Sequence, residues 1–199
     1  MKWHTRIFCL SVAAAIVAIA LRPTGSGAAE SSSVEYALDA AHCAVVFRIS
    51  HLGMSYTYGR FNDVSGQFSV NGSDLANSSF ECTIKTASVD TNNRKRDDHL
   101  RSPDFFDAKQ FPVMTFKTNS AHAHGTKLHV TGDMSLHGVT RPIEFHLNKM
   151  GEGKDPWGNQ RIGFSTEFKI KRSEFGMDQN LKIVGDEVEL LISFEGVRK

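Results

Sequence analysis

The densest group of charged side chains in this sequence lies between Asp90 and Arg101. Its basic members, which could meet an oxygen-rich polar group, are Arg94, Arg96, His99 and Arg101. Arginine suits that task because its planar guanidinium offers a fork of N–H donors to a phosphate or carbonyl oxygen. The acidic neighbours Asp97 and Asp98 offer an alternative, since they can hold Arg96 and Arg101 in ion pairs that serve only the fold.

A second group that could do chemistry is the histidine trio His122, His124 and His129, which flanks one turn. Histidine is a common ligand of zinc, so a metal-dependent enzyme is one interpretation. No carboxylate completes a recognised ligand motif around the trio, and a polar hairpin is the more common setting for such histidines. We therefore predict no catalytic residue, no metal ligand and no enzymatic activity.

Nucleophilic catalysis lacks its usual sequence context, because the chain contains no G-x-S-x-G motif. Cys43 and Cys82 fall within predicted strands, which favours two buried, unreactive thiols. A disulfide between them is the alternative, because export would permit one. The two predicted strands are about two positions apart, however, and that separation exceeds the ~7 Å between Cα atoms that a disulfide can span.

Most of the chain after residue 40 alternates between apolar and polar side chains with a period of two. The stretches 43–50, 80–85 and 188–194 show this pattern, which is typical of antiparallel strands with one dry face. Turn signals such as His137-Gly138 separate about eight such strands. A sheet of this kind can hide its dry face by closing on itself. We predict an all-β antiparallel barrel, with a two-sheet sandwich as the alternative.

The charged group interrupts the alternation and predicts a different local structure. Asn93 to Leu100 contains no β-branched residue, Gly or Pro, which favours a short helix. Asn92 or Asn93 can cap it and Pro103 would end it. Several phenylalanines follow, so we expect a short helical plug between strands of the barrel, polar outside and aromatic inside.

The inward faces of the predicted strands are rich in phenylalanine, of which the chain has 14, against 2 Trp and 3 Tyr. Such a lining offers few hydrogen bonds and suits a hydrocarbon chain. The alternative is a barrel filled by its own side chains, in a stress or interaction protein without a ligand. The residues predicted to line the interior are Val45, Phe47, Ile49, Leu52, Phe68, Phe80, Ile84, Leu100, Phe105, Phe106, Phe111, Phe116, Met134, Phe145, Phe164, Phe168, Leu190 and Ile192.

Residues 1–29 are typical of a secretory signal peptide, with Lys2 and Arg6, an apolar run and then small residues up to Ala29. A retained N-terminal anchor is the alternative. Residues 30–199 are then one periplasmic or secreted domain with no stable membrane anchor. Residues 1–29 hold three of the 23 basic residues and no acidic one, so the domain has 20 basic and 22 acidic residues. This balance argues against nucleic-acid binding.

Several motifs resemble the YceI-like family. The most specific is the run HLRSPDFFD from His99 to Asp107, and the others are DAAH from Asp39, HLGMS from His51, GDMSLHG from Gly132, KRSEFG from Lys171 and GDEVEL from Gly185. They occur in order and span nearly all of the predicted domain. Two departures are Cys43, where the family usually has serine, and the additional basic pair Arg94-Lys95.

This resemblance implies a lipocalin-like exported barrel that holds a polyisoprenoid chain. Such proteins are similar to carriers or sequestering proteins for isoprenoid quinones or prenyl phosphates and are not established enzymes. It implies a bound isoprenoid lipid with no other cofactor, a role in transport, storage or sequestration, and a monomer or homodimer. The tail would lie in the barrel and the head group at its polar mouth. The candidates to meet the head group are His51, Arg94, Arg96, His99 and Arg101.

Overall fold

The computed structural model describes residue 1 and residues 33–71, 75–124 and 127–199. The predicted signal peptide, apart from Met1, lies outside the described residues. Every strand described below lies within the unit Ser31–Lys199. Among the described residues, no helix is long and apolar enough to cross a membrane.

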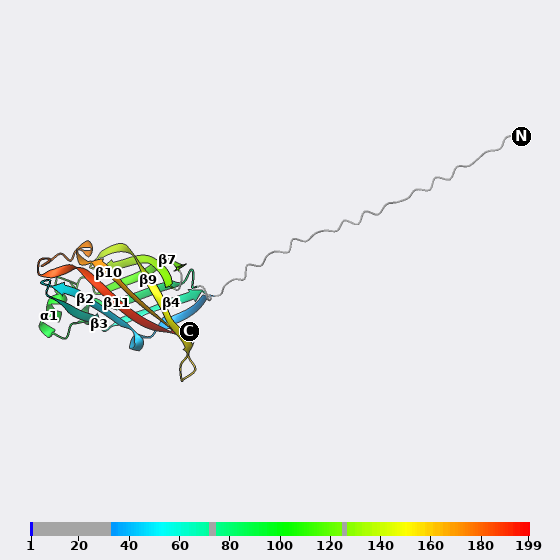
Figure 1. The fold of residues 1–199 in the computed structure, drawn as a ribbon, viewed down its shortest axis with the longest axis horizontal. Coiled ribbons are helices and arrows are strands. Elements are labelled where there is room, and N and C mark those ends of the chain that lie inside the picture. The colour runs from blue at the N-terminus through cyan, green and yellow to red at the C-terminus, as the bar shows by residue number, and fades with distance from the viewer. Residues whose placement is uncertain (2–32, 72–74, 125–126) are drawn as a thin grey trace. The chain divides into compact units, whose positions relative to one another are not determined.

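Within the described residues, eleven strand segments form one antiparallel sheet (Figure 1). Their bounds are β1 Ser33–Leu38, β2 Ala44–His51, β3 Ser55–Phe61, β4 Val64–Asn71, β5 Ser79–Lys85, β6 Val89–Asp90, β7 Val113–His124, β8 Lys127–Leu136, β9 Val139–Lys154, β10 Gln160–Lys171 and β11 Val184–Arg198. The helix α1 spans Arg94–Leu100, and short 3-10 helices span η1 Ala40–His42, η2 Thr86–Ser88 and η3 Arg172–Phe175.

The sheet closes into an eight-strand barrel because β1 pairs with both β4 and β11. β11 pairs with β2 along its first part and with β1 at its last residues, so β1 and β2 act as one strand interrupted by η1. β3 and β4, and likewise β5 and β6, are separated only by short breaks. The closing β1–β11 pairing confirms the predicted barrel and excludes the sandwich.

Alternate residues of each strand point into the barrel, as the sequence pattern predicts. Along β8, for example, the alternate residues Leu128, Val130, Gly132, Met134 and Leu136 are buried, and the residues that alternate with them are more exposed. The buried side chains form two clusters. The cluster nearer α1 includes Phe47, Phe61 and Met114, and the cluster nearer the β9–β10 turn includes Phe68, Phe80 and Phe164.

The helix α1 lies at the end of the barrel where β2 meets β3 (Figure 1). It begins after Asn93, whose side-chain oxygen accepts a hydrogen bond from the Arg96 amide at 3.1 Å. The buried carboxylate of Asp97 accepts hydrogen bonds from the amide and hydroxyl of Thr91, at 2.8 and 2.6 Å. These bonds fix the short helix against the barrel, so the predicted helical plug is confirmed.

Arg161 of β10 ties together segments near the opposite end. Its guanidinium contacts the carboxylates of Asp39 at 2.6 Å, Asp155 at 2.9 Å and Glu195 at 3.0 Å. The hydrogen bond from Arg161, and next the one from His42, lowers the pKa of Asp39 from 3.8 to about 2.

We predict that this cluster makes the barrel sensitive to acid. Because the folded-state pKa of Asp39 is below its unfolded value, the stability it contributes is present above about pH 3.8 and is lost as the pH falls through about 2. Arg161→Ala should therefore lower the free energy of unfolding at neutral pH and flatten its decline across this acid range. Urea unfolding at a series of pH values measures the free energy of unfolding and its fall with pH. If this free energy falls as steeply in Arg161→Ala as in the unmodified protein, the prediction is wrong.

Candidate ligand-binding cavities

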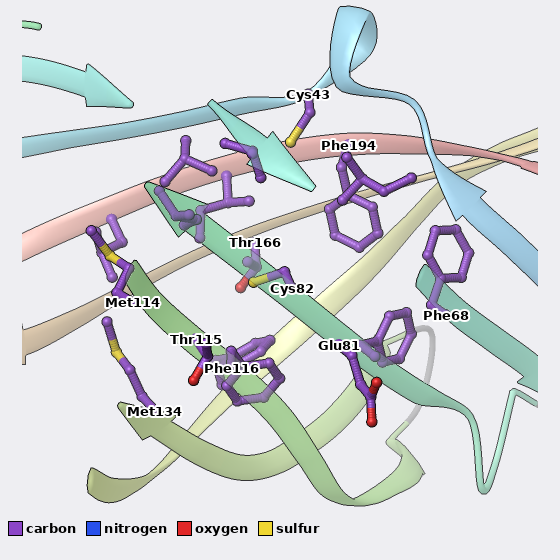
Figure 2. Close-up of a pocket in the computed structure, with 18 of the residues that line it drawn as sticks. Cys43, Phe68, Glu81, Cys82, Met114, Thr115, Phe116, Met134, Thr166 and Phe194 are labelled. Carbon is purple, nitrogen blue, oxygen red and sulfur yellow. The ribbon is translucent and has the colours of Figure 1, made fainter. Parts of the chain in front are cut away.

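The barrel interior contains a central apolar cavity of about 120 Å³ (Figure 2). Strands from all around the barrel contribute to its wall, because each presents its apolar face inward. The predicted lining residues that lie on this wall are Val45, Phe68, Phe80, Ile84, Phe116, Met134, Phe145, Phe168, Leu190 and Ile192. The period-two pattern therefore placed these ten residues on one apolar surface, although other residues complete the wall.

A second apolar cavity of about 90 Å³ lies beneath α1. The predicted residues on its wall are Phe47, Ile49, Leu100, Phe105 and Phe106, and Met134 and Leu190 also reach it. Four side chains line both cavities and form a partition between them: Phe61, Met114, Met134 and Leu190. The aromatic face of the predicted plug thus roofs the second cavity.

Three predicted lining residues lie on the wall of neither cavity. Leu52 is in the turn between β2 and β3 and is 50% exposed, because that turn extends beyond the sheet. Phe111 packs instead against the ring of His137, with ring centroids 4.8 Å apart. Phe164 is 1% exposed and fills the barrel near the β9–β10 turn, edge to face with Phe80.

Two cysteines that we predicted to be buried prove to face the central cavity. Both are free thiols, and Figure 2 shows Cys43 and Cys82 on the cavity wall together with the thioethers of Met114 and Met134. The signal was present in the sequence, since Cys43 shares the face of Val45 and Cys82 the face of the other inward residues of β5. Burial raises the pKa of each thiol to about 11.

We expect Cys43 and Cys82 to resist alkylation in the folded protein at neutral pH. The thiolate is the reacting species, and a pKa of about 11 leaves very little of it. Mass spectrometry after iodoacetamide treatment, with and without denaturant, should show modification at these two positions only in the unfolded chain. Rapid modification of both in the native protein would contradict this expectation.

Two of the head-group candidates, Arg96 and Arg101, are engaged in holding the plug in place. Arg96 donates hydrogen bonds to the hydroxyl and carbonyl oxygens of Thr91, at 2.7 and 2.8 Å. Arg101 donates to the carbonyl oxygens of Ala87 and Val89, both at 2.8 Å, and pairs with Asp98. Arg96 therefore anchors α1 through Thr91 and not through the predicted ion pair.

The other three candidates do not converge on one site. His99 contacts Asp104 at 2.9 Å and the edge of the Phe105 ring. Arg94 is exposed at the start of α1, and His51 is exposed at the end of β2. The side chains of these three residues line neither cavity.

The histidine trio lies on the outer wall. His129 of β8 is directly opposite His122 of β7 and His146 of β9, and the ring of His124 stacks on that of His146 at 5.3 Å. His146 was not predicted as a member of this group, although its position on the outward face of β9 follows from the alternation of that strand. Among the described residues, no three His, Cys, Asp or Glu side chains are placed to hold a metal ion.

The sequence reasoning also missed a buried charge at the second cavity. Arg172 is 3% exposed and lies over the Phe105 ring at 5.8 Å. It donates hydrogen bonds to the carbonyl oxygens of Gly185 at 2.9 Å, Met177 at 2.7 Å, Gln179 at 2.8 Å and Val184 at 2.9 Å. Burial lowers its pKa. The guanidinium thus fixes the segment that connects η3 to β11.

The chain is similar in sequence and in fold to known proteins. Residues 36–196 match the YceI-like domain. Protein YceI of Escherichia coli O157:H7 is 41% identical over 174 residues, which is 87% of this chain and 91% of that protein. The crystal structure of the Campylobacter jejuni YceI protein has a TM-score of 0.69 at 34% identity and covers 75% of this chain and 90% of its own.

A second similar structure is a polyisoprenoid binding domain from Saccharophagus degradans, implicated in plant cell wall breakdown. Its TM-score is 0.64, and the match covers 83% of this chain and 99% of that domain. At 16% sequence identity this likeness shows a shared fold alone.

Proposed function

Because this chain belongs to the YceI-like domain family, we propose that it is an exported lipid-binding protein that holds a long isoprenoid chain inside its barrel. The observation that carries the proposal is the central apolar cavity, which continues toward a second one beneath α1. Membership of this family supports binding in preference to catalysis. A polyisoprenoid binding domain has the same fold, so a barrel of this kind can hold such a ligand.

The energetics favour a long tail over a small terpene. Burial of one CH₂ group contributes at most ~0.8 kcal/mol, so one five-carbon isoprene unit contributes up to ~4 kcal/mol. Association costs ~4–15 kcal/mol before any net affinity appears. Several isoprene units must therefore be buried, and the tail then supplies most of the affinity.

The cavities must join to hold such a tail. Elsewhere, a cavity of about 150 Å³ takes up one benzene molecule, so the 120 and 90 Å³ present here each suit roughly one isoprene unit. The partition between them includes Met114 and Met134, and methionine side chains adapt readily because they are unbranched and flexible. Movement of these two thioethers would give one continuous channel along the barrel.

We further propose that residues 1–29 direct export and are removed, and that the protein acts in the periplasm or outside the cell. There it would transport, store or sequester a prenyl quinone or prenyl phosphate as a monomer or homodimer. A barrel closed on itself can do this alone, because it leaves few free sheet edges for a partner.

The dependence of affinity on tail length tests this function. We expect the dissociation constants of ubiquinones with one, two and eight isoprene units to fall at least tenfold between the first two, and then to level off once the channel is full. Each dissociation constant is measured by competition, from the fluorescence of a fatty-chain probe that the ubiquinone displaces. Equal affinities for all three tails, or no binding of any, would contradict the proposal.

A further inference from the structure

The seam between β9 and β10 is open over the half nearer α1. The two strands pair only where Gln160–Ser165 face Lys154–Asn148. In the described ladders, residues 166–171 of β10 pair with β11 alone, and residues 139–147 of β9 pair with β8 alone. One side-chain bond bridges the start of the gap, from the Thr166 hydroxyl to the His146 carbonyl at 2.8 Å. Two strand edges thus face each other without a ladder.

One residue in the sequence disfavours pairing between β9 and β10 in this stretch. Pro142 lies in the unpaired stretch of β9, opposite Asp133 of β8. Proline has no N–H to donate and is tolerated in sheets mainly on strands with one unpaired side. A complete ladder between β9 and β10 is therefore disfavoured at Pro142.

A cleft of about 460 Å³ lies between the two strands and leads toward both internal cavities. Ile143 and Phe168 line this cleft and also the central cavity, and Ile170 lines the cleft and the cavity beneath α1. The rings of Phe145 and Phe168 stack with their centroids 4.7 Å apart. Only a thin layer of apolar side chains therefore separates the cleft from the barrel interior.

The cleft also contains uncommitted hydrogen-bond donors. Its charged residues are Arg141, Lys169, Lys171, Glu144, Glu174 and Glu187. Lys169 pairs with Glu187 at 2.7 Å, and the Nε of Arg141 donates to the Glu174 carbonyl at 3.1 Å. Within the described residues, neither Arg141 nor Lys171 forms an ion pair with a carboxylate. Both can therefore donate to a bound molecule.

We propose that this seam is the entrance to the barrel, and that the head group of the bound lipid stays in the cleft. The isoprenoid tail passes between β9 and β10 by displacing the Phe145–Phe168 pair. Arg141 and Lys171 donate hydrogen bonds to oxygen atoms of the head group, which are the carbonyls of a quinone or the phosphate of a prenyl phosphate. This inference rests on the proposed function. It places the head group in the cleft between β9 and β10, and not beside α1 as the sequence predicted.

The end covered by α1 is a less suitable entrance. Leu100, Phe105 and Phe106 roof the cavity there, and Arg96 and Arg101 tie the helix to neighbouring backbone. Opening that end breaks several charge-assisted hydrogen bonds, whereas opening the seam moves apolar side chains and breaks two side-chain bonds, from the Thr166 hydroxyl and from Arg141.

A reversible crosslink across the seam tests the entrance. Glu144→Cys with Lys169→Cys places two thiols in the cleft, each four residues beyond the last paired positions, Asn148 and Ser165. Oxidation, or a short bis-maleimide where the thiols do not join directly, should slow uptake of ubiquinone at least tenfold. Reduction of the disulfide should restore the rate. The matched control is Lys117→Cys with Asp133→Cys, a directly paired position on the closed β7–β8 seam.

The outcomes separate the entrance from the function. If the reduced variant takes up ubiquinone and the joined variant does so as fast as the joined control, the seam is not the entrance, although the proposed function stands. If even the unmodified protein takes up neither ubiquinone nor prenyl phosphate, the function fails and the entrance with it.

The head-group contact has its own test. Arg141→Gln with Lys171→Gln should weaken binding of ubiquinone and prenyl phosphate at least tenfold and leave binding of squalene, which has no head group, unchanged. A larger loss for the phosphate identifies an anionic head group, and a larger loss for ubiquinone identifies a carbonyl one. Equal losses for all three ligands, or none, would overturn the assignment.

Discussion

Cys82→Phe should abolish the binding of long prenyl chains and leave the barrel folded. Cys82 points into the central cavity of about 120 Å³, so a phenyl ring there occupies the space that one isoprene unit would fill. Loss of one buried unit removes up to ~4 kcal/mol, equivalent to a dissociation constant raised up to about a thousandfold. Because the ring fills an existing void, the overpacking penalty of ~1–3 kcal/mol for a close-packed core should be largely avoided.

Thr83→Phe provides the matched control, since the next residue along β5 faces the other side of the sheet and does not line the cavity. Titration with ubiquinone and a thermal melt of each variant give affinity and stability together. A Cys82→Phe protein that melts normally and binds the long tail as well as Thr83→Phe does would contradict a ligand in this cavity.

Arg172→Leu should cause the largest loss of stability among single substitutions near the second cavity. Leucine preserves much of the apolar packing on Phe105 but removes the donors that satisfy four backbone carbonyl oxygens. Each hydrogen bond to a charged group contributes about 1.5–3 kcal/mol, and bonds of one side chain are not additive, so we expect a loss of at least ~3 kcal/mol.

Lys182→Ala, at an exposed site in the same connecting segment, is the control and should change the free energy of unfolding by less than ~0.5 kcal/mol. Urea unfolding followed by far-ultraviolet circular dichroism measures both variants. If Arg172→Leu is as stable as Lys182→Ala, the guanidinium is not the support of the segment between η3 and β11.

The barrel could be predicted because its cause is local and repeated. A period-two pattern with one apolar face requires that this face be buried, and residues such as Val45, Phe80 and Met134 were assigned inward from their neighbours alone. The same rule locates Cys43 and Cys82 on the cavity wall, so they could have been included among the predicted lining residues. The helix of the plug was predictable because Asn93 caps its start and Pro103 prevents it from continuing.

The polar part of the site depends on long-range contacts that sequence spacing does not encode. Nothing near Arg96 or Arg101 shows that backbone carbonyl oxygens occupy their guanidinium groups. Arg172 is buried because a segment several residues away folds over it. The open seam follows from the register of β9 against β10, of which Pro142 is the one local sign.

The central claim is that the barrel encloses a lipid tail, and native mass spectrometry of the protein recovered from its own cells tests it most directly. The proposal predicts a folded species that is heavier than the polypeptide by the mass of one prenyl lipid, together with release of that lipid into organic solvent. A folded protein whose mass is that of the polypeptide alone, and which remains so after incubation with prenyl quinone and prenyl phosphate, would contradict it.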